Sequence, residues 1–180
     1  MAILKNSILE AAEQKIESGL MPDNQVNYQK IVVAGMHAGM AKNGSLLVSL
    51  HKSKDPVSDC ANGAVKLCMI LRRQSHGIMP LKAMVPAAMT LMLQALDFCD
   101  KSGIAKIGTP ELVRATHIFT NTMFAAFKIT PQMIHTAAGK IHGIMQDPAK
   151  MEMLKRRAGV VKAPGASEPT PMPPADAEAA

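Results

Sequence analysis

The sequence predicts an all-α fold, a helical bundle of about six to seven helices followed by a disordered, Pro/Ala-rich C-terminal tail. Two observations predict the bundle. A residue suited to capping a helix stands directly before a proline four times, at Asp55-Pro56, Thr109-Pro110, Thr130-Pro131 and Asp147-Pro148. Asp and Thr side chains accept hydrogen bonds from the free amides of a helix start, and proline suits the first helical position. Apolar residues then recur at helical spacing after these pairs.

Three elements are expected before Asp55. A helix is predicted over 2–18, because apolar residues recur there every four positions, at Leu4, Ile8, Ala12 and Ile16. A second helix is predicted to follow the turn at 21–24 and to run to about Lys42, before Asn43-Gly44. The apolar run 45–51 fits either a helical turn or a strand, and its length does not decide between them.

The middle of the chain predicts the core. Over 56–73 one side of the predicted helix is apolar, with Val57, Ala61, Val65, Cys68 and Leu71. The next segment, 80–100, is apolar almost all round except for a stripe at Thr90, Gln94, Asp97 and Lys101. A helix that is apolar on nearly every side belongs at the centre of a bundle. The neighbouring carboxyl groups of Asp97 and Asp100 are interpreted as ordinary helix surface.

Further helices are predicted over 109–127 and 130–146, and a short one from Asp147 to about Arg157. Composition changes near Gly159, after which five of the twelve prolines occur among Ala, Ser and Glu. Such a segment buries too little apolar surface to offset the entropy of ordering. We therefore expect an α-helical domain over 1–158 and a disordered tail over 159–180.

The composition favours an adaptable core and a basic surface. The chain has 15 Met but only 4 Phe, 1 Tyr and no Trp, so its core relies on flexible aliphatic side chains. The net charge is +6, and between Asn24 and Leu96 eight basic residues face only Asp55 and Asp59. A solvated basic face explains this pattern. Contact with an anionic partner through Lys66, Arg72, Arg73 and Lys82 is the alternative, although stacking aromatics are not interleaved with them.

The sequence contains no recognisable catalytic or cofactor motif, which predicts a non-enzymatic protein without cofactor or metal. The three cysteines lack disulfide or zinc-finger spacing. Of these, Cys60 alone follows a predicted helix start, the setting in which a thiol becomes reactive. The six histidines are not spaced to share a metal ion; His135 and His142, for example, would lie about 10.5 Å apart along one helix.

Two glycines predict a close helix contact. Gly35 and Gly39 are four residues apart in an uncharged run that also holds Met36 and Met40. Glycine costs about 1 kcal/mol relative to alanine within a helix, and close approach of another helix would offset that cost. The partner helix belongs either to the same chain or to another subunit, and both alternatives stay open.

No signal peptide or membrane-spanning helix is expected. The chain does not open on a charged segment followed by an apolar one. Its longest uncharged apolar stretch, 83–96, has 14 residues and contains Pro86, and about 18 to 20 residues are needed to cross a bilayer.

In general character, with Met- and Ala-rich helices, Gly35 and Gly39, few aromatics and a Pro/Ala tail, the chain resembles small virion proteins of short-tailed bacteriophages. Within that class it is most similar to the internal proteins that are ejected with the genome. The resemblance implies a structural protein made in the host cytoplasm and located in the virion. It would form homo-oligomers, contact other virion proteins and the host envelope, and help to build a conduit for genome delivery. A helical nucleic-acid-binding or packaging-associated protein is the alternative.

Overall fold

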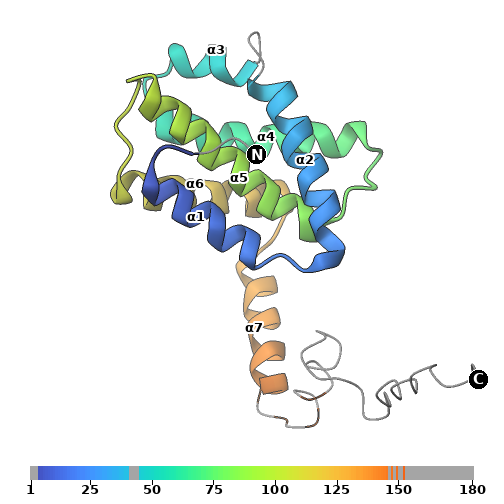
Figure 1. Ribbon diagram of the computed structural model, residues 1–180. Helices are drawn as coiled ribbons and strands as arrows, with labels where there is room; N and C mark the ends of the chain where they lie inside the picture. Colours follow the sequence, from blue (N-terminus) through green and yellow to red (C-terminus); the bar gives the residue numbers. More distant parts are fainter. Residues whose placement is uncertain (1–3, 41–44, 146, 148, 150–151, 153–180) are drawn as a thin grey trace, which may run out of the picture. The chain divides into compact units, whose positions relative to one another are not determined.

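The computed structural model describes residues 4–40 and 45–145, together with 147, 149 and 152. Within this part of the chain there are seven α-helices and no strand (Figure 1). The helices are α1 (Ser7–Ser18), α2 (Pro22–Met40), α3 (Ser45–His51), α4 (Pro56–Gln74), α5 (Leu81–Lys101), α6 (Thr109–Ala126) and α7 (Pro131–Met145). The predicted all-α class is confirmed, and the run 45–51, left open between helix and strand, is helical.

The chain divides into two compact units, Met1–Lys128 and Ile129–Ala180. The first holds α1 to α6 and the second holds α7. The sequence did not predict a division at Lys128. The predicted tail, the predicted boundary at 158–159 and most of the short helix expected after Asp147 lie outside the described residues, so they stay predictions.

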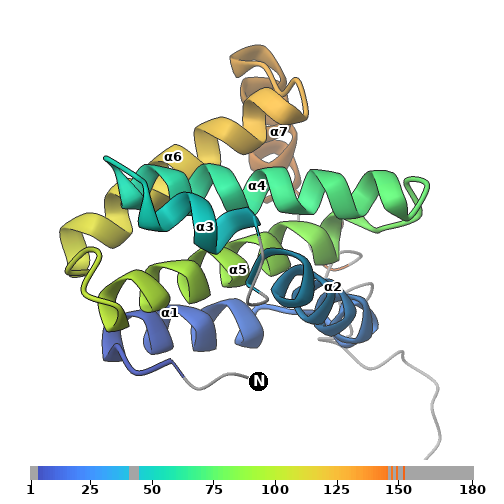
Figure 2. The same cartoon turned by 90° about the horizontal axis from the view of Figure 1, so that it is seen from above.

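Helix α5 is the centre of the first unit, as its nearly continuous apolar sequence predicted. It packs against α1, α2 and α4, and Figure 2 shows it between α1 and α4. Met84, Leu91 and Leu96 on this helix are completely buried. Helix α4 forms the second contact surface, against α6, α3 and α2. Its predicted apolar side is confirmed, because all five of its residues are buried: Val57, Ala61, Val65, Cys68 and Leu71.

The first helix is shorter than predicted. It begins at Ser7, where the sequence pattern predicted a start near Ala2. Asn6 has an extended backbone, and its side chain accepts a hydrogen bond from the amide of Ile8 at 3.1 Å. Leu4 is nevertheless buried, so its apolar character reflects packing of the segment that precedes the helix. The four-residue spacing from Leu4 therefore did not mark a turn of helix.

Three of the four predicted capping side chains accept a hydrogen bond from a nearby backbone amide, and Asp147 accepts from that of Ala149 at 3.1 Å. Asp55 accepts from the amide of Ser58 at 3.3 Å, and Thr130 accepts from that of Met133 at 3.3 Å. The interpretation of Thr109 as a cap was wrong, since α6 already includes it. The capping position is Gly108, whose amide donates to the carboxylate of Glu111 at 2.9 Å and so brings the helix start one residue earlier.

Candidate functional site

The predicted glycine contact is made inside the chain. A methyl group placed on Gly35 would overlap Cδ1 of Leu91 on α5, and one on Gly39 would lie 2.7 Å from Cδ2 of Leu67 on α4. Both glycines are buried. Met36 is partly buried against the same core, while the side chain of Met40 lies outside the described part of the structure. Of the two alternatives left open, the structure supports packing within the chain.

The structure shows a third close contact at a glycine, which the sequence did not predict. A methyl group on Gly63 of α4 would overlap Cδ1 of Leu46 on α3. Gly63 stands alone, without a second glycine four residues away on its helix. The pair of glycines four residues apart, which predicted the contact at Gly35 and Gly39, does not occur around Gly63.

Three residues of the polar stripe of α5, Thr90, Gln94 and Asp97, are buried and hydrogen-bonded, whereas Lys101 is exposed. The hydroxyl groups of Thr90 and Tyr28 lie 2.8 Å apart, and Nε2 of Gln94 donates to Glu13 at 3.5 Å. Burial raises the pKa of both Glu13 and Tyr28, because an ionised group there would lose its hydration. The stripe therefore joins α5 to α1 and α2 by polar contacts within the core.

Asp97 was wrongly interpreted as helix surface. Its side chain is buried, and the residue is only 3% exposed. Oδ1 accepts hydrogen bonds from the backbone amides of Lys5 and Asn6, at 3.1 and 3.2 Å, and Oδ2 forms an ion pair with Lys101. The carboxylate thus binds the segment that leads into α1.

Asp100 also binds this N-terminal segment. Its carboxylate accepts from the amide of Ile107 and from Nδ2 of Asn6, both at 3.0 Å. These hydrogen bonds to the charged form lower the pKa of Asp100. Asn6 also donates to the carbonyl of Ile107 at 2.9 Å. The N-terminal segment, the end of α5 and the loop before α6 are therefore held together by one polar cluster.

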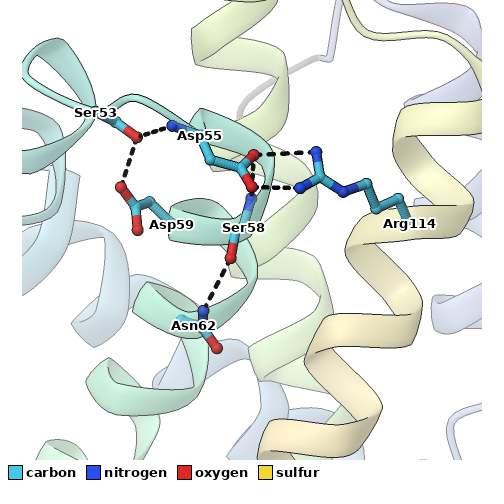
Figure 3. Close-up of polar contacts among 6 residues, drawn as sticks. All are labelled: Ser53, Asp55, Ser58, Asp59, Asn62 and Arg114. Atoms are coloured by element: carbon cyan, nitrogen blue, oxygen red, sulfur yellow. Dashed lines mark hydrogen bonds and ion pairs between the residues drawn. The ribbon is translucent and has the colours of Figure 1, made fainter.

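A second polar network surrounds the start of α4 (Figure 3). The guanidinium of Arg114 on α6 binds both carboxylate oxygens of Asp55. The hydroxyl of Ser53 accepts from the amide of Asp55 at 3.0 Å and donates to Asp59 at 2.6 Å. Asn62 continues the connection to α6, because it accepts from Thr122 at 2.7 Å. This network fastens α4 to α6, although an exposed ion pair adds only about 1 kcal/mol or less.

The four basic residues predicted to contact an anion have different surroundings in the structure. Lys66 lines a pocket beside α3 together with Asp59, whereas Lys82 lines a different pocket beside α1. The guanidinium of Arg72 lies over the ring of Phe127, 5.2 Å from its centroid. Arg73 is exposed at the end of α4. Contact of these four residues with an anionic partner stays a prediction.

The three cysteines are completely buried. Sγ of Cys60 lies 3.7 Å from Sγ of Cys99, and this hydrogen-bonding contact together with burial raises the pKa of the Cys60 thiol. Burial also raises the pKa of Cys68, to about 12. The position of Cys60 in the first turns of α4 had suggested a reactive thiol, but its surroundings oppose formation of the thiolate.

We expect the native thiols to be unreactive. With DTNB at pH 8, the folded chain should react at least ~100-fold more slowly than the unfolded chain, because reaction requires opening of the core. In denaturant all three thiols should titrate. If one native thiol reacted as fast as free cysteine, and this fast reaction were absent in Cys60→Ser, Cys60 would be a reactive thiol and the prediction would be wrong.

Helix α5 is long and apolar enough to cross a membrane, judged by length and composition alone, and it is the one such helix among the described residues. However, 67% of its apolar window is buried within the bundle. The side chains of Thr90, Gln94 and Asp97 also have polar partners there. The place of α5 in the core accounts for its hydrophobicity.

No protein-family model, curated protein or solved structure matches the chain. Its surface is therefore the basis for a functional proposal. Apolar side chains are exposed on several helices, and α7 is the clearest case. All residues from 131 to 139 are exposed, including Met133 at 56% and Ile134 at 42%. Along this helix Ile134, Ala138, Ile141 and Met145 recur at spacings of four, three and four.

Proposed function

We propose that this chain is a non-enzymatic structural protein of a bacteriophage virion that forms homo-oligomers through apolar helix faces. The observation that supports the proposal is α7, a 15-residue helix with exposed Met and Ile side chains. A helix of this length is only marginally stable alone in water, and most helical stability in proteins comes from burying an apolar face. The apolar face of α7 therefore needs a partner.

A second copy of α7 is the partner that its sequence fits. Spacings of four and three residues are those of a coiled-coil seam, in which identical helices pack their apolar stripes together. The small side chain of Ala138, within the apolar stripe formed by Ile134, Ala138, Ile141 and Met145, allows two backbones to approach closely. Self-association through α7 would leave α1 to α6 as the body of each subunit.

The virion setting comes from the resemblance to small proteins of short-tailed bacteriophages. There the chain would contact other virion proteins and, after ejection, the host envelope, as part of a conduit for the genome. A Met-rich bundle suits this role, because methionine side chains adapt to changed surroundings at low cost.

Light scattering coupled to gel filtration tests the self-association. The wild-type chain should elute as an oligomer whose mass falls with dilution, and Ile134→Glu should shift it toward the monomer by at least about tenfold in dissociation constant. Gln132→Glu is the matched control, because it adds the same charge to the same helix away from the stripe. An Ile134→Glu variant that associates like the control would contradict the role of α7.

Binding to DNA would point to the other function class. A protein that uses several cations on phosphates loses affinity steeply as salt rises. If the chain bound duplex DNA in this manner, and Lys66→Ala with Arg73→Ala removed the binding, a packaging-associated protein would replace the structural one. A strict monomer that binds neither membranes nor other virion proteins would remove the proposal altogether.

A further inference from the structure

A continuous groove follows one face of α1. It consists of three adjoining pockets of about 430, 280 and 440 Å³. The first and second pockets share Ala12, Lys15 and Leu112, and the second and third share Lys15, Ile16 and Met89. Helix α1 forms one wall, α6 lines the first two pockets, and α5 supplies residues to the second and third. We call this surface the α1 groove.

The α1 groove is apolar and rich in methionine. Met89 of α5 is partly buried and lines its middle, with the buried Met92 beneath it, and Met21, which is 55% exposed, lies at one end. Ile8 and Val85 are also exposed within it, each at 37%. Soluble proteins usually cover contiguous apolar surface of this kind, unless it binds a partner. Methionine side chains are well suited to such surfaces, because they adjust to the shape of a ligand.

The charges along the α1 groove have one sign. Lys15 lines all three pockets and Lys82 lines the third, and no Asp or Glu occurs among the described residues that form the walls. The buried acidic residue of α1, Glu13, contacts Gln94 and is not part of the walls. A ligand with carboxylates near Lys15 and Lys82 would therefore be attracted, and a basic ligand repelled.

The length and lining of the groove suit a helix. The 12 residues of α1 rise about 18 Å, which accommodates roughly three turns of a second helix lying alongside. Short amphipathic helices bind in such grooves through apolar residues at positions i, i+3, i+4 and i+7. A proline-rich peptide would need aromatic walls, and the described residues lining the α1 groove include none.

We propose that the α1 groove binds an acidic amphipathic helix of a partner protein. The partner would bury its apolar face against Met89 and Met21 and would place Asp or Glu side chains beside Lys15 and Lys82. A second copy of α7 does not meet this description, because α7 contains Lys140 and no acidic residue. The inference therefore goes beyond the proposed self-association and does not depend on it.

Binding of two synthetic peptides to the full chain tests the proposal. Both are 18-residue amphipathic helices with the same Leu and Met face, and they differ only in carrying Glu or Lys on the flanks. By fluorescence anisotropy the acidic peptide should bind with micromolar affinity, and Lys15→Glu with Lys82→Glu should weaken it by about tenfold or more. The basic peptide should bind the wild-type chain more weakly than the acidic peptide does, and the two charge reversals should strengthen its binding. Lys30→Glu, an exposed position outside the groove, is the matched control.

Methyl NMR locates the binding. With ¹³C-methyl-labelled methionine, the acidic peptide should shift the signals of Met89 and Met21, which line the α1 groove and which Met→Leu variants identify. Repeating the titration in the Ile134→Glu background separates this result from self-association through α7. The proposal is overturned if neither peptide binds below 1 mM, if charge reversal leaves the affinity unchanged, or if vesicles of anionic lipid shift these methionines while the acidic peptide does not.

Discussion

Asp97→Ala should lower the free energy of unfolding by about 2 to 3 kcal/mol, because its buried carboxylate accepts two backbone hydrogen bonds and pairs with Lys101. The substitution would leave the amides of Lys5 and Asn6 without their acceptor and Lys101 without its ion pair. Each buried polar group that loses its partner costs about 1 to 3 kcal/mol. Urea unfolding followed by circular dichroism measures the loss.

The matched control for this prediction is Asp59→Ala. Asp59 is exposed and accepts one hydrogen bond, from Ser53, so its removal should cost less than about 1 kcal/mol. Hydrogen exchange adds a local readout, since the amides of Lys5 and Asn6 should lose protection in Asp97→Ala before the core of α5 does. Equal destabilisation by both substitutions would mean that Asp97 does not hold the N-terminal segment.

Gly35→Leu should destabilise the bundle by about 3 kcal/mol, because the contact between α2 and α5 has no room for a side chain. A methyl group alone would overlap Cδ1 of Leu91 and lie 2.9 Å from its Cδ2, and Leu91 is completely buried. Gly35→Ala should therefore lose stability, even though alanine favours a helix by about 1 kcal/mol. Thermal or urea unfolding measures both variants.

A double substitution separates the steric effect from helix propensity. Leu91→Ala removes the atoms that the new methyl group would meet, so Gly35→Ala should be far less harmful in that background, with a coupling of about 1 kcal/mol or more. Gly139→Ala is the control, because no heavy atom lies within 4 Å of the added group. It should leave the bundle unaffected and favour α7. Additive effects of Gly35→Ala and Leu91→Ala would refute close packing at this point.

The two proposals assign different functions to two surfaces of the molecule. Helix α7 would join copies of the chain, and the α1 groove would bind a different protein. Both surfaces are apolar, but they differ in the kind of helix that they would bind. The 3.5-residue repeat of α7 selects a matching helix, whereas Lys15 and Lys82 select an acidic one. The effect of Ile134→Glu on self-association and the effect of Lys15→Glu on peptide binding are therefore independent tests of the two proposals.

The sequence alone determined the helices and the place of α5 in the core. The bounds of α4, α5 and α7 agree with the predicted ones to within about one residue, because capping and helical spacing depend on residues within one or two turns. The buried side of α4 was predicted for the same reason. The local sequence pattern gave a wrong helix start where a residue distant in the sequence binds the backbone. The start of α1 depends on Asp97, which is 92 positions from Lys5 and looked like helix surface.

Only the tertiary structure decided which surfaces were used and which were left open. Gly35 and Gly39 could have faced another subunit, and the contacts with Leu91 and Leu67 assign them to the interior. Residues of α1, α5 and α6 line the α1 groove, and no pattern within one helix reveals that they adjoin. The physical reason is common to both cases. Hydrophobic burial is non-directional, so the sequence states that a face is apolar, while packing alone determines what covers it.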